Sequence, residues 1–174
     1  DIEEVFRETG VTYQRVLDRF RPCRPGGEFL EQNLITLFCH EFLNYFGSKA
    51  CAYTEIPFMG VAGGNGWQAR LDGFLIEGEN GYVLEAKGSL SADSLFSAIN
   101  ADVNRINSRN LGKSLSEMFR GNPEPMNMYG LVIADCWRHE KKLDDGAQFD
   151  RWVSDDIVGE YPHLGKLNRR VMPL

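Results

Sequence analysis

The chain has 174 residues, 43% of them hydrophobic and 25% charged, with a formal net charge of −6 at neutral pH. This length suffices for one domain that buries most of its apolar surface. The acidic balance excludes a strongly basic surface that would bind nucleic acid by charge alone, so contact with DNA or RNA would need a local patch. No apolar run approaches the length of about 18 residues that a membrane helix needs, so we expect no membrane partner.

The cysteines and the first residues favour a cytoplasmic protein. Four cysteines are present, without a Cys-x-x-Cys pair or a histidine at zinc-finger spacing, so a structural zinc is not expected and reduced thiols fit best. The stretch "DIEEVFRETG" resembles neither a signal peptide nor a basic amphipathic leader.

Two helices are predicted ahead of the first strand. The first 20 residues read as an amphipathic helix that the prolines and glycines of "RPCRPGG" end. In "GGEFLEQNLITLFCHEFLNYFG" a second helix follows, with Gly47 as its C-cap residue. Its predicted apolar face consists of Leu34, Ile35, Phe38, Phe42 and Tyr45.

Three strands, a helix, a fourth strand and a last helix are predicted along the rest of the chain. Strands are predicted over 51–58, 67–77 and 82–88, followed by a helix over 91–108. A nearly continuous apolar run, "MYGLVIADCW", predicts a fourth, central strand, and a last helix is expected over Ala147–Val158. This order predicts an α/β fold, a three-layer sandwich with a mixed central β-sheet flanked by helices.

Asp72, Glu85 and Lys87 interrupt the apolar strands of the predicted hairpin "RLDGFLIEGENGYVLEAKG". Side chains alternate along a strand, so Glu85 and Lys87 share one face. Asp72 faces the same side if the turn is "GE", "GENG" or "NG"; a "GE" turn sets Asp72 directly opposite Glu85, with Cβ atoms about 5 Å apart. Charges on such apolar strands must be solvated, paired or bound to an ion.

The pattern suits a hard cation beside a phosphate. Two close carboxylates repel each other, which raises a pKa or recruits a cation, and oxygen ligands without His or Cys select Mg²⁺ or Mn²⁺. Lys87 would point the same way and could orient or help deprotonate a nucleophilic water, or offset charge on phosphoryl oxygens. The chemistry indicated is hydrolysis of a phosphodiester.

A further carboxylate is expected from the second helix. Glu31 continues its apolar stripe at helical spacing and so points an acid inward. Glu28, one turn earlier, is the alternative for this role.

With these residues the chain resembles the PD-(D/E)xK nuclease superfamily, which has the restriction-endonuclease-like fold. The resemblance lies in a helical Glu31, a strand with Asp72, "Glu85-Ala86-Lys87" on the next strand and a helix after it, over roughly residues 28 to 137. Leu71 stands where the name-giving proline would be. A second Glu-x-Lys, at Glu140, lies in a charged loop and has no such context.

The resemblance implies a Mg²⁺- or Mn²⁺-dependent nuclease, for which DNA is favoured over RNA as the substrate and RNA stays open. Asp72, Glu85 and the Ala86 carbonyl would be metal ligands, Lys87 the catalytic lysine and Glu31 the helical acid. The polar face of the following helix, at Asn100, Asn104 and Arg105, would lie near the site and could touch phosphate. The chain then divides into a helical extension over 1–25, a motif-bearing core over 26–137 and a C-terminal helix and tail over 138–174.

Two other interpretations remain open from the sequence. The three hairpin charges could form a surface cross-strand ion pair between Lys87 and either acid, worth only about 0–1 kcal/mol. The domain could also be a non-catalytic or partner-dependent nuclease-fold module within a larger nucleic-acid-processing or defence assembly. A homodimer, or a partner protein that supplies DNA targeting, is compatible with either.

Overall fold

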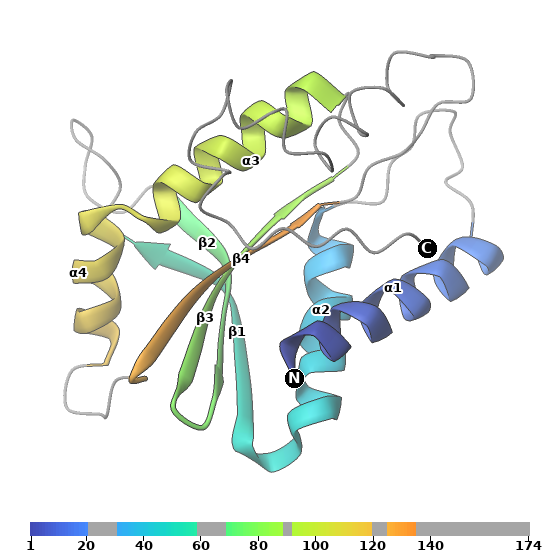
Figure 1. Ribbon diagram of the computed structural model, residues 1–174, viewed down its shortest axis with the longest axis horizontal. Helices are drawn as coiled ribbons and strands as arrows, with labels where there is room; N and C mark the ends of the chain where they lie inside the picture. Colours follow the sequence, from blue (N-terminus) through green and yellow to red (C-terminus); the bar gives the residue numbers. More distant parts are fainter. Residues whose placement is uncertain (21–30, 59–68, 89–91, 120–124, 135–174) are drawn as a thin grey trace.

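The computed structural model describes residues 1–20, 31–58, 69–88, 92–119 and 125–134 (Figure 1). Its elements in chain order are α1 (Ile2–Arg19), α2 (Glu31–Phe46), the 3-10 helix η1 (Gly47–Lys49), β1 (Ala50–Phe58), β2 (Ala69–Glu77), β3 (Asn80–Lys87), α3 (Ala92–Ile106), α4 (Arg109–Met118) and β4 (Asn127–Ala134). The expected last helix, Ala147–Val158, lies outside the described residues.

The described strands form one mixed sheet in the order β1-β2-β3-β4. β1, β2 and β3 are antiparallel neighbours, whereas β4 runs parallel to β3. The predicted α/β class and mixed sheet are therefore confirmed. The central position expected for β4 is wrong for the described sheet, since β4 lies at its edge and Met128 and Tyr129 are exposed. An apolar run alone does not distinguish a central strand from an edge strand that is partly buried along its second half.

A two-residue turn, Gly78-Glu79, fixes the register of the β2–β3 hairpin. Glu77 pairs with Asn80 directly across this turn, and the pairing continues to Gly73 opposite Leu84. Gly78 has a φ of 56°, which a residue without Cβ adopts at low cost and which the first residue of a tight hairpin turn often needs. The structure thus selects the "GE" turn among the three that the sequence allowed.

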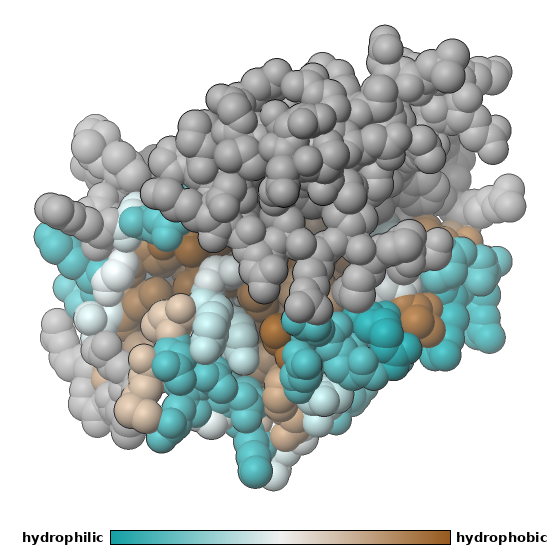
Figure 2. All heavy atoms as spheres, viewed as in Figure 1, coloured by the Kyte–Doolittle hydropathy of each residue, from teal (hydrophilic) through white to brown (hydrophobic). Residues whose placement is uncertain are grey.

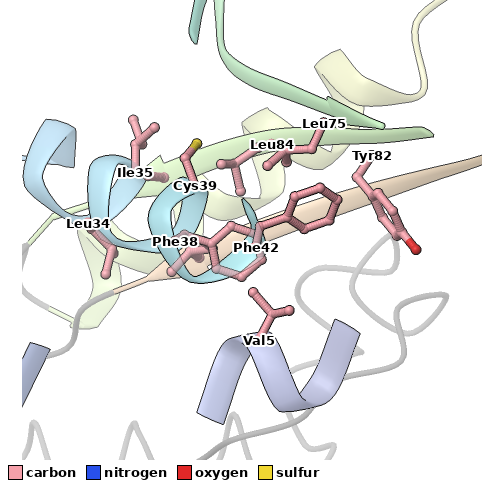
Figure 3. Packing of buried hydrophobic residues seen from close by; sticks show 11 residues of the cluster. Val5, Leu34, Ile35, Phe38, Cys39, Phe42, Leu75, Tyr82 and Leu84 are labelled. Carbon is pink, nitrogen blue, oxygen red and sulfur yellow. The ribbon is translucent and has the colours of Figure 1, made fainter. Parts of the chain in front are cut away.

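The first face of the sheet is covered by α2, with α1 packed on the outside of α2. Figure 3 shows α2 between Val5 of α1 and the inward side chains of Leu75 and Leu84. Phe38 and Phe42 are fully buried at the centre of this layer, and Phe38 also meets the ring of Phe6 at a centroid distance of 4.8 Å. This face is held together by a continuous apolar core.

α2 largely follows its predicted pattern. Leu34, Ile35, Phe38 and Phe42 are buried as expected, and the helix ends before Gly47, which has a φ of 61°. The prediction for Tyr45 is wrong: its side chain is exposed, because the stripe that faces the core continues from Phe42 to Phe46 rather than to Tyr45.

The second face of the sheet carries α3 and α4. A smaller apolar cluster joins α4 to the strands through Leu111 and Leu115, which pack with Phe74, Val83 and their neighbours. The sequence did not predict α4, although Ser108 caps its first turn by accepting a hydrogen bond from the Leu111 amide. In Figure 1, α3 and α4 lie on the side of the sheet away from α1 and α2.

The outer surface of α1 is largely hydrophilic, as expected for an amphipathic helix whose buried residues include Val5 and Tyr13 (Figure 2). None of the described helices combines the length and apolarity needed to cross a membrane.

Candidate functional site

The candidate site lies at the end of the β2–β3 hairpin that is far from its turn. Glu85 and Lys87 have the same strand parity as Val83, so they face the side of the sheet that α3 and α4 cover. Extending the register by one position places Asp72 opposite Glu85. The Asp72 Oδ2 atom accepts a hydrogen bond of 2.7 Å from the Ala86 amide. The Asp72 side chain therefore contacts β3 at the position where the backbone pairing of β2 and β3 ends.

β1 departs from regular geometry beside Asp72. Glu55 has a φ of 56° and separates the paired positions Thr54–Gly73 and Ile56–Leu71. A side chain in this left-handed region costs about 1–2 kcal/mol relative to an extended strand residue. This strained backbone position of Glu55 therefore lies next to the site.

Glu85 is a fully buried carboxylate that faces Arg105 of α3. Arg105 Nε donates a hydrogen bond of 2.9 Å to Glu85 Oε1, and its Nη2 lies 2.5 Å from Oε2 in an ion pair without hydrogen-bond geometry. Burial raises the pKa of Glu85 to about 8; Arg105 opposes this shift, whereas the charges of Asp72 and Asp102 add to it. The pKa rises because an acid without solvent contact binds its proton more tightly.

Asp102 of α3 contacts both cations of the site, Lys87 and Arg105. Its Oδ2 lies 2.9 Å from Lys87 Nζ, and its Oδ1 lies 2.7 Å from Arg105 Nη2. Lys87 Nζ also donates a hydrogen bond of 3.0 Å to the Ala86 carbonyl. Glu85, Arg105, Asp102 and Lys87 therefore form one connected chain of alternating charges, which we call the ionic chain.

The neighbouring acids keep Lys87 charged. Its burial alone would lower the pKa of Lys87, but the contact with Asp102 and the charges of Glu31 and Asp72 raise the pKa above its ordinary value. Burial is also the main cause of a raised pKa at Asp102, against which Lys87 and Arg105 act. At neutral pH Lys87 is therefore protonated, and its ammonium group is paired with Asp102.

Glu31, the first residue of α2, reaches this site. Its Oε1 accepts a hydrogen bond of 3.0 Å from the amide of Gly88, directly after β3. The helical acid expected from the sequence is thus brought beside Lys87. Its alternative, Glu28, lies outside the described residues.

The three residues predicted on the polar face of α3 differ in their burial and contacts. Arg105 enters the site, whereas Asn104 is exposed. Asn100 is partly buried, and its Oδ1 has no hydrogen-bond partner among the described atoms. This arrangement does not support a shared contact of the three side chains with one phosphate.

The surface ion pair considered from the sequence is wrong. Lys87 pairs with Asp102 rather than with a hairpin acid, and Glu85 is fully buried. The reason is α3, which covers this end of the hairpin and supplies a partner for each charge.

Sequence reasoning did not identify Asp102. The signal was available, because Asp102 lies between Ile99 and Ile106 at spacings of three and four, on the face that α3 buries. An acid within an apolar helical stripe was the criterion that selected Glu31, and it selects Asp102 equally.

A hard cation fits this donor set by chemistry, although its ligands are not assembled as a cage. Within the described ranges no group of three or more His, Cys, Asp or Glu is placed to hold a metal ion. Asp72 and Glu85 nevertheless offer carboxylate oxygens from opposite positions of neighbouring strands, and Glu85 Oε2 is buried, makes no hydrogen bond and contacts the Arg105 guanidinium. These oxygens, with the Ala86 carbonyl, are the candidate ligands.

Comparison of the chain with protein-family models, with curated proteins and with solved structures gives no significant match.

Proposed function

We propose that this chain is a metal-dependent nuclease of the restriction-endonuclease-like fold, which hydrolyses phosphodiester bonds of DNA. The observation that carries the proposal is the convergence of Glu31, Asp72, Glu85 and Lys87 from three different elements at one end of the β2–β3 hairpin. Such a group combines oxygen ligands for a cation with a protonated lysine, and both can stabilise the charge that develops when a phosphodiester is hydrolysed.

In this proposal Asp72, Glu85 and the Ala86 carbonyl hold Mg²⁺ or Mn²⁺. The ion supplies Lewis-acid stabilisation of the phosphate and lowers the pKa of a bound water. Glu85 would serve in its ionised form, since a protonated carboxyl is a poor ligand, and Arg105 favours that form. Glu31 fixes the backbone after β3 through Gly88 and so holds the end of the motif strand.

Lys87 acts in this mechanism as a positive charge. Because its pKa is raised, Lys87 is protonated at neutral pH and is suited to stabilise the negative charge that develops on the phosphoryl oxygens. Asp102 is a positioning residue for Lys87, whose ammonium it holds at 2.9 Å. Removal of a proton from water by Lys87 is the less favoured of the two roles expected from the sequence.

A second candidate function is a nuclease-fold module that binds without cutting. The ionic chain favours it, since Lys87 and Arg105 already have carboxyl partners in Asp102 and Glu85. The net charge of −6 points the same way, because affinity for DNA depends largely on neutralising phosphates. A homodimer or a partner protein that carries a basic surface would supply that affinity in either case.

The test is cleavage of plasmid and single-stranded DNA at millimolar Mg²⁺ or Mn²⁺, with EDTA as the blank. We compare wild type, Asp72→Asn, Lys87→Met and Lys113→Met, the last an exposed lysine of α4 that serves as the matched control. We expect metal-dependent cutting by wild type and Lys113→Met, and a loss of about 10²-fold or more in the other two.

Two outcomes would decide against the nuclease. Lys87→Met at the wild-type rate would remove the assigned mechanism. Folded wild type that binds Mn²⁺ but cuts none of these substrates would favour the non-cutting module.

A further inference from the structure

One nitrogen atom of Arg105 bridges two carboxylates from different elements. Its Nη2 lies 2.5 Å from Glu85 Oε2 of β3 and 2.7 Å from Asp102 Oδ1 of α3. The carboxylates are almost without solvent contact, with side-chain exposures of 0% and 5%, while the arginine side chain is 32% exposed. The positive group therefore enters from the solvent side and lies over two buried acids.

The acids exceed the cations at this place. The site holds four acids and two cations. Asp72, Asp102 and Arg105 act on Glu85, and Asp102, Glu31 and Asp72 act on Lys87. Two buried oxygens, Glu85 Oε2 and Asp102 Oδ2, have no partner that meets hydrogen-bond geometry among the described residues, and each is held by a cation instead: Arg105 Nη2 at 2.5 Å and Lys87 Nζ at 2.9 Å. A buried carboxylate oxygen in such a contact depends on the positive charge beside it, which an amino-acid side chain or a metal ion can supply.

We propose that Asp102 is a third carboxylate of the cation site, and that the Arg105 guanidinium occupies the place between Glu85 and Asp102 that a divalent cation takes when it binds. Arg105 is then a resident competitor of the ion. The inference rests on the proposed metal dependence and goes beyond it, because it adds a ligand and names the group that must leave.

The exposure of Arg105 makes this exchange physically accessible. A side chain with a third of its surface in solvent can move outward without opening the apolar clusters, which contain neither Arg105 nor its partners. The apparent affinity for a divalent cation is then the intrinsic affinity multiplied by the fraction of time that Arg105 has moved away from the carboxylates. Lys87 still holds the other oxygen of Asp102 after such a movement.

The experiment measures Mn²⁺ binding to the full chain by isothermal titration calorimetry and by electron paramagnetic resonance of the free ion. We compare wild type, Arg105→Gln, Asp102→Asn, the double variant and Arg7→Gln. Arg7 is the matched control, because it makes an exposed ion pair with Glu4 on α1, on the other side of the sheet from the site.

We expect Arg105→Gln to bind Mn²⁺ at least about tenfold more tightly than wild type, and Arg7→Gln to match wild type. Asp102→Asn should bind more weakly than wild type, and the double variant should lose the gain of Arg105→Gln, since two residues of one site are not additive. Arg105→Gln that folds only in the presence of Mn²⁺ would also support the inference. If it does not fold in either condition, Arg105→Lys, which cannot bridge with a planar fork, should show a smaller gain in the same direction.

Equal affinities for wild type and the purified Arg105 variant would overturn the inference, as would a gain that persists in the double variant. The proposed function is judged separately by Asp72→Asn. If Asp72→Asn abolishes Mn²⁺ binding while the Arg105 variant matches wild type, only the inference fails. If none of the proteins binds Mn²⁺, the cation site is absent and both proposals fail.

Discussion

The two faces of the sheet are stabilised in different ways. On the α2 face, Val5, Phe38, Phe42, Leu75 and Leu84 form a continuous apolar core. On the α3 face, an apolar cluster near α4 gives way at the far end of the hairpin to the ionic chain. Apolar burial gains free energy without directional demands, whereas buried charges cost free energy unless every one is paired. The first face is suited to hold the fold, and the second to hold a site.

The largest expected effect comes from the apolar face. Phe38→Ala should lower the free energy of unfolding by about 3–5 kcal/mol, because it removes a fully buried ring and leaves a cavity against Phe6. The measurement is urea denaturation followed by circular dichroism. Leu43→Ala, on the exposed side of the same helix, should cost less than about 1 kcal/mol. Equal losses in both variants would mean that α2 does not carry the core.

The ionic face should respond to pH where the apolar face does not. The pKa of Glu85 is raised from 4.5 to about 8, so between these values the folded protein keeps a proton that the unfolded chain releases. Stability contributed by this proton is complete below pH 4.5 and is lost as the pH rises through about 8. Glu85→Gln removes this titration.

We therefore expect wild type to lose stability relative to Glu85→Gln as the pH rises through this window, by at most about 1.4 kcal/mol per pH unit. Urea denaturation of both proteins at several pH values in EDTA measures the difference. A constant difference between about pH 5 and 9 would contradict the raised pKa of Glu85.

The smallest expected effect concerns the spacing between α3 and the sheet. A Cβ atom at Gly130 of β4 would lie 2.7 Å from Cγ2 of Ile106 at the end of α3. Gly130→Ala should therefore push the two elements apart and cost about 1–2 kcal/mol. An added Cβ at Gly112 of α4 meets no described atom within 4 Å. Gly112→Ala should instead stabilise the protein by about 0.5–1 kcal/mol through helix propensity. Thermal unfolding of both variants tests the contrast, and the same sign in both would contradict the close approach at Gly130.

Local patterns predicted most of the described elements. Periodicity located α1, α2 and α3 and the three hairpin-connected strands, because each of these segments presents its apolar residues at the spacing of its own secondary structure. α4 was missed because its ten residues include Gly112 and several polar residues, so its short apolar repeat at Leu111 and Leu115 is weak. β4 was recognised as a strand, but its place in the sheet depends on its neighbours.

For the candidate site, strand parity alone predicts that Asp72, Glu85 and Lys87 share one face of the sheet. The sequence by itself determined this because side chains alternate along a strand and a hairpin turn of even length keeps the parity. Only the tertiary structure decided the partners of these charges. The docking of α3 over the hairpin sets Asp102 against Lys87 and Arg105 against Glu85, and α2 brings Glu31 to Gly88 from 57 residues away. Such pairings depend on how separate elements pack in space, and that information is not contained in the periodicity of either element.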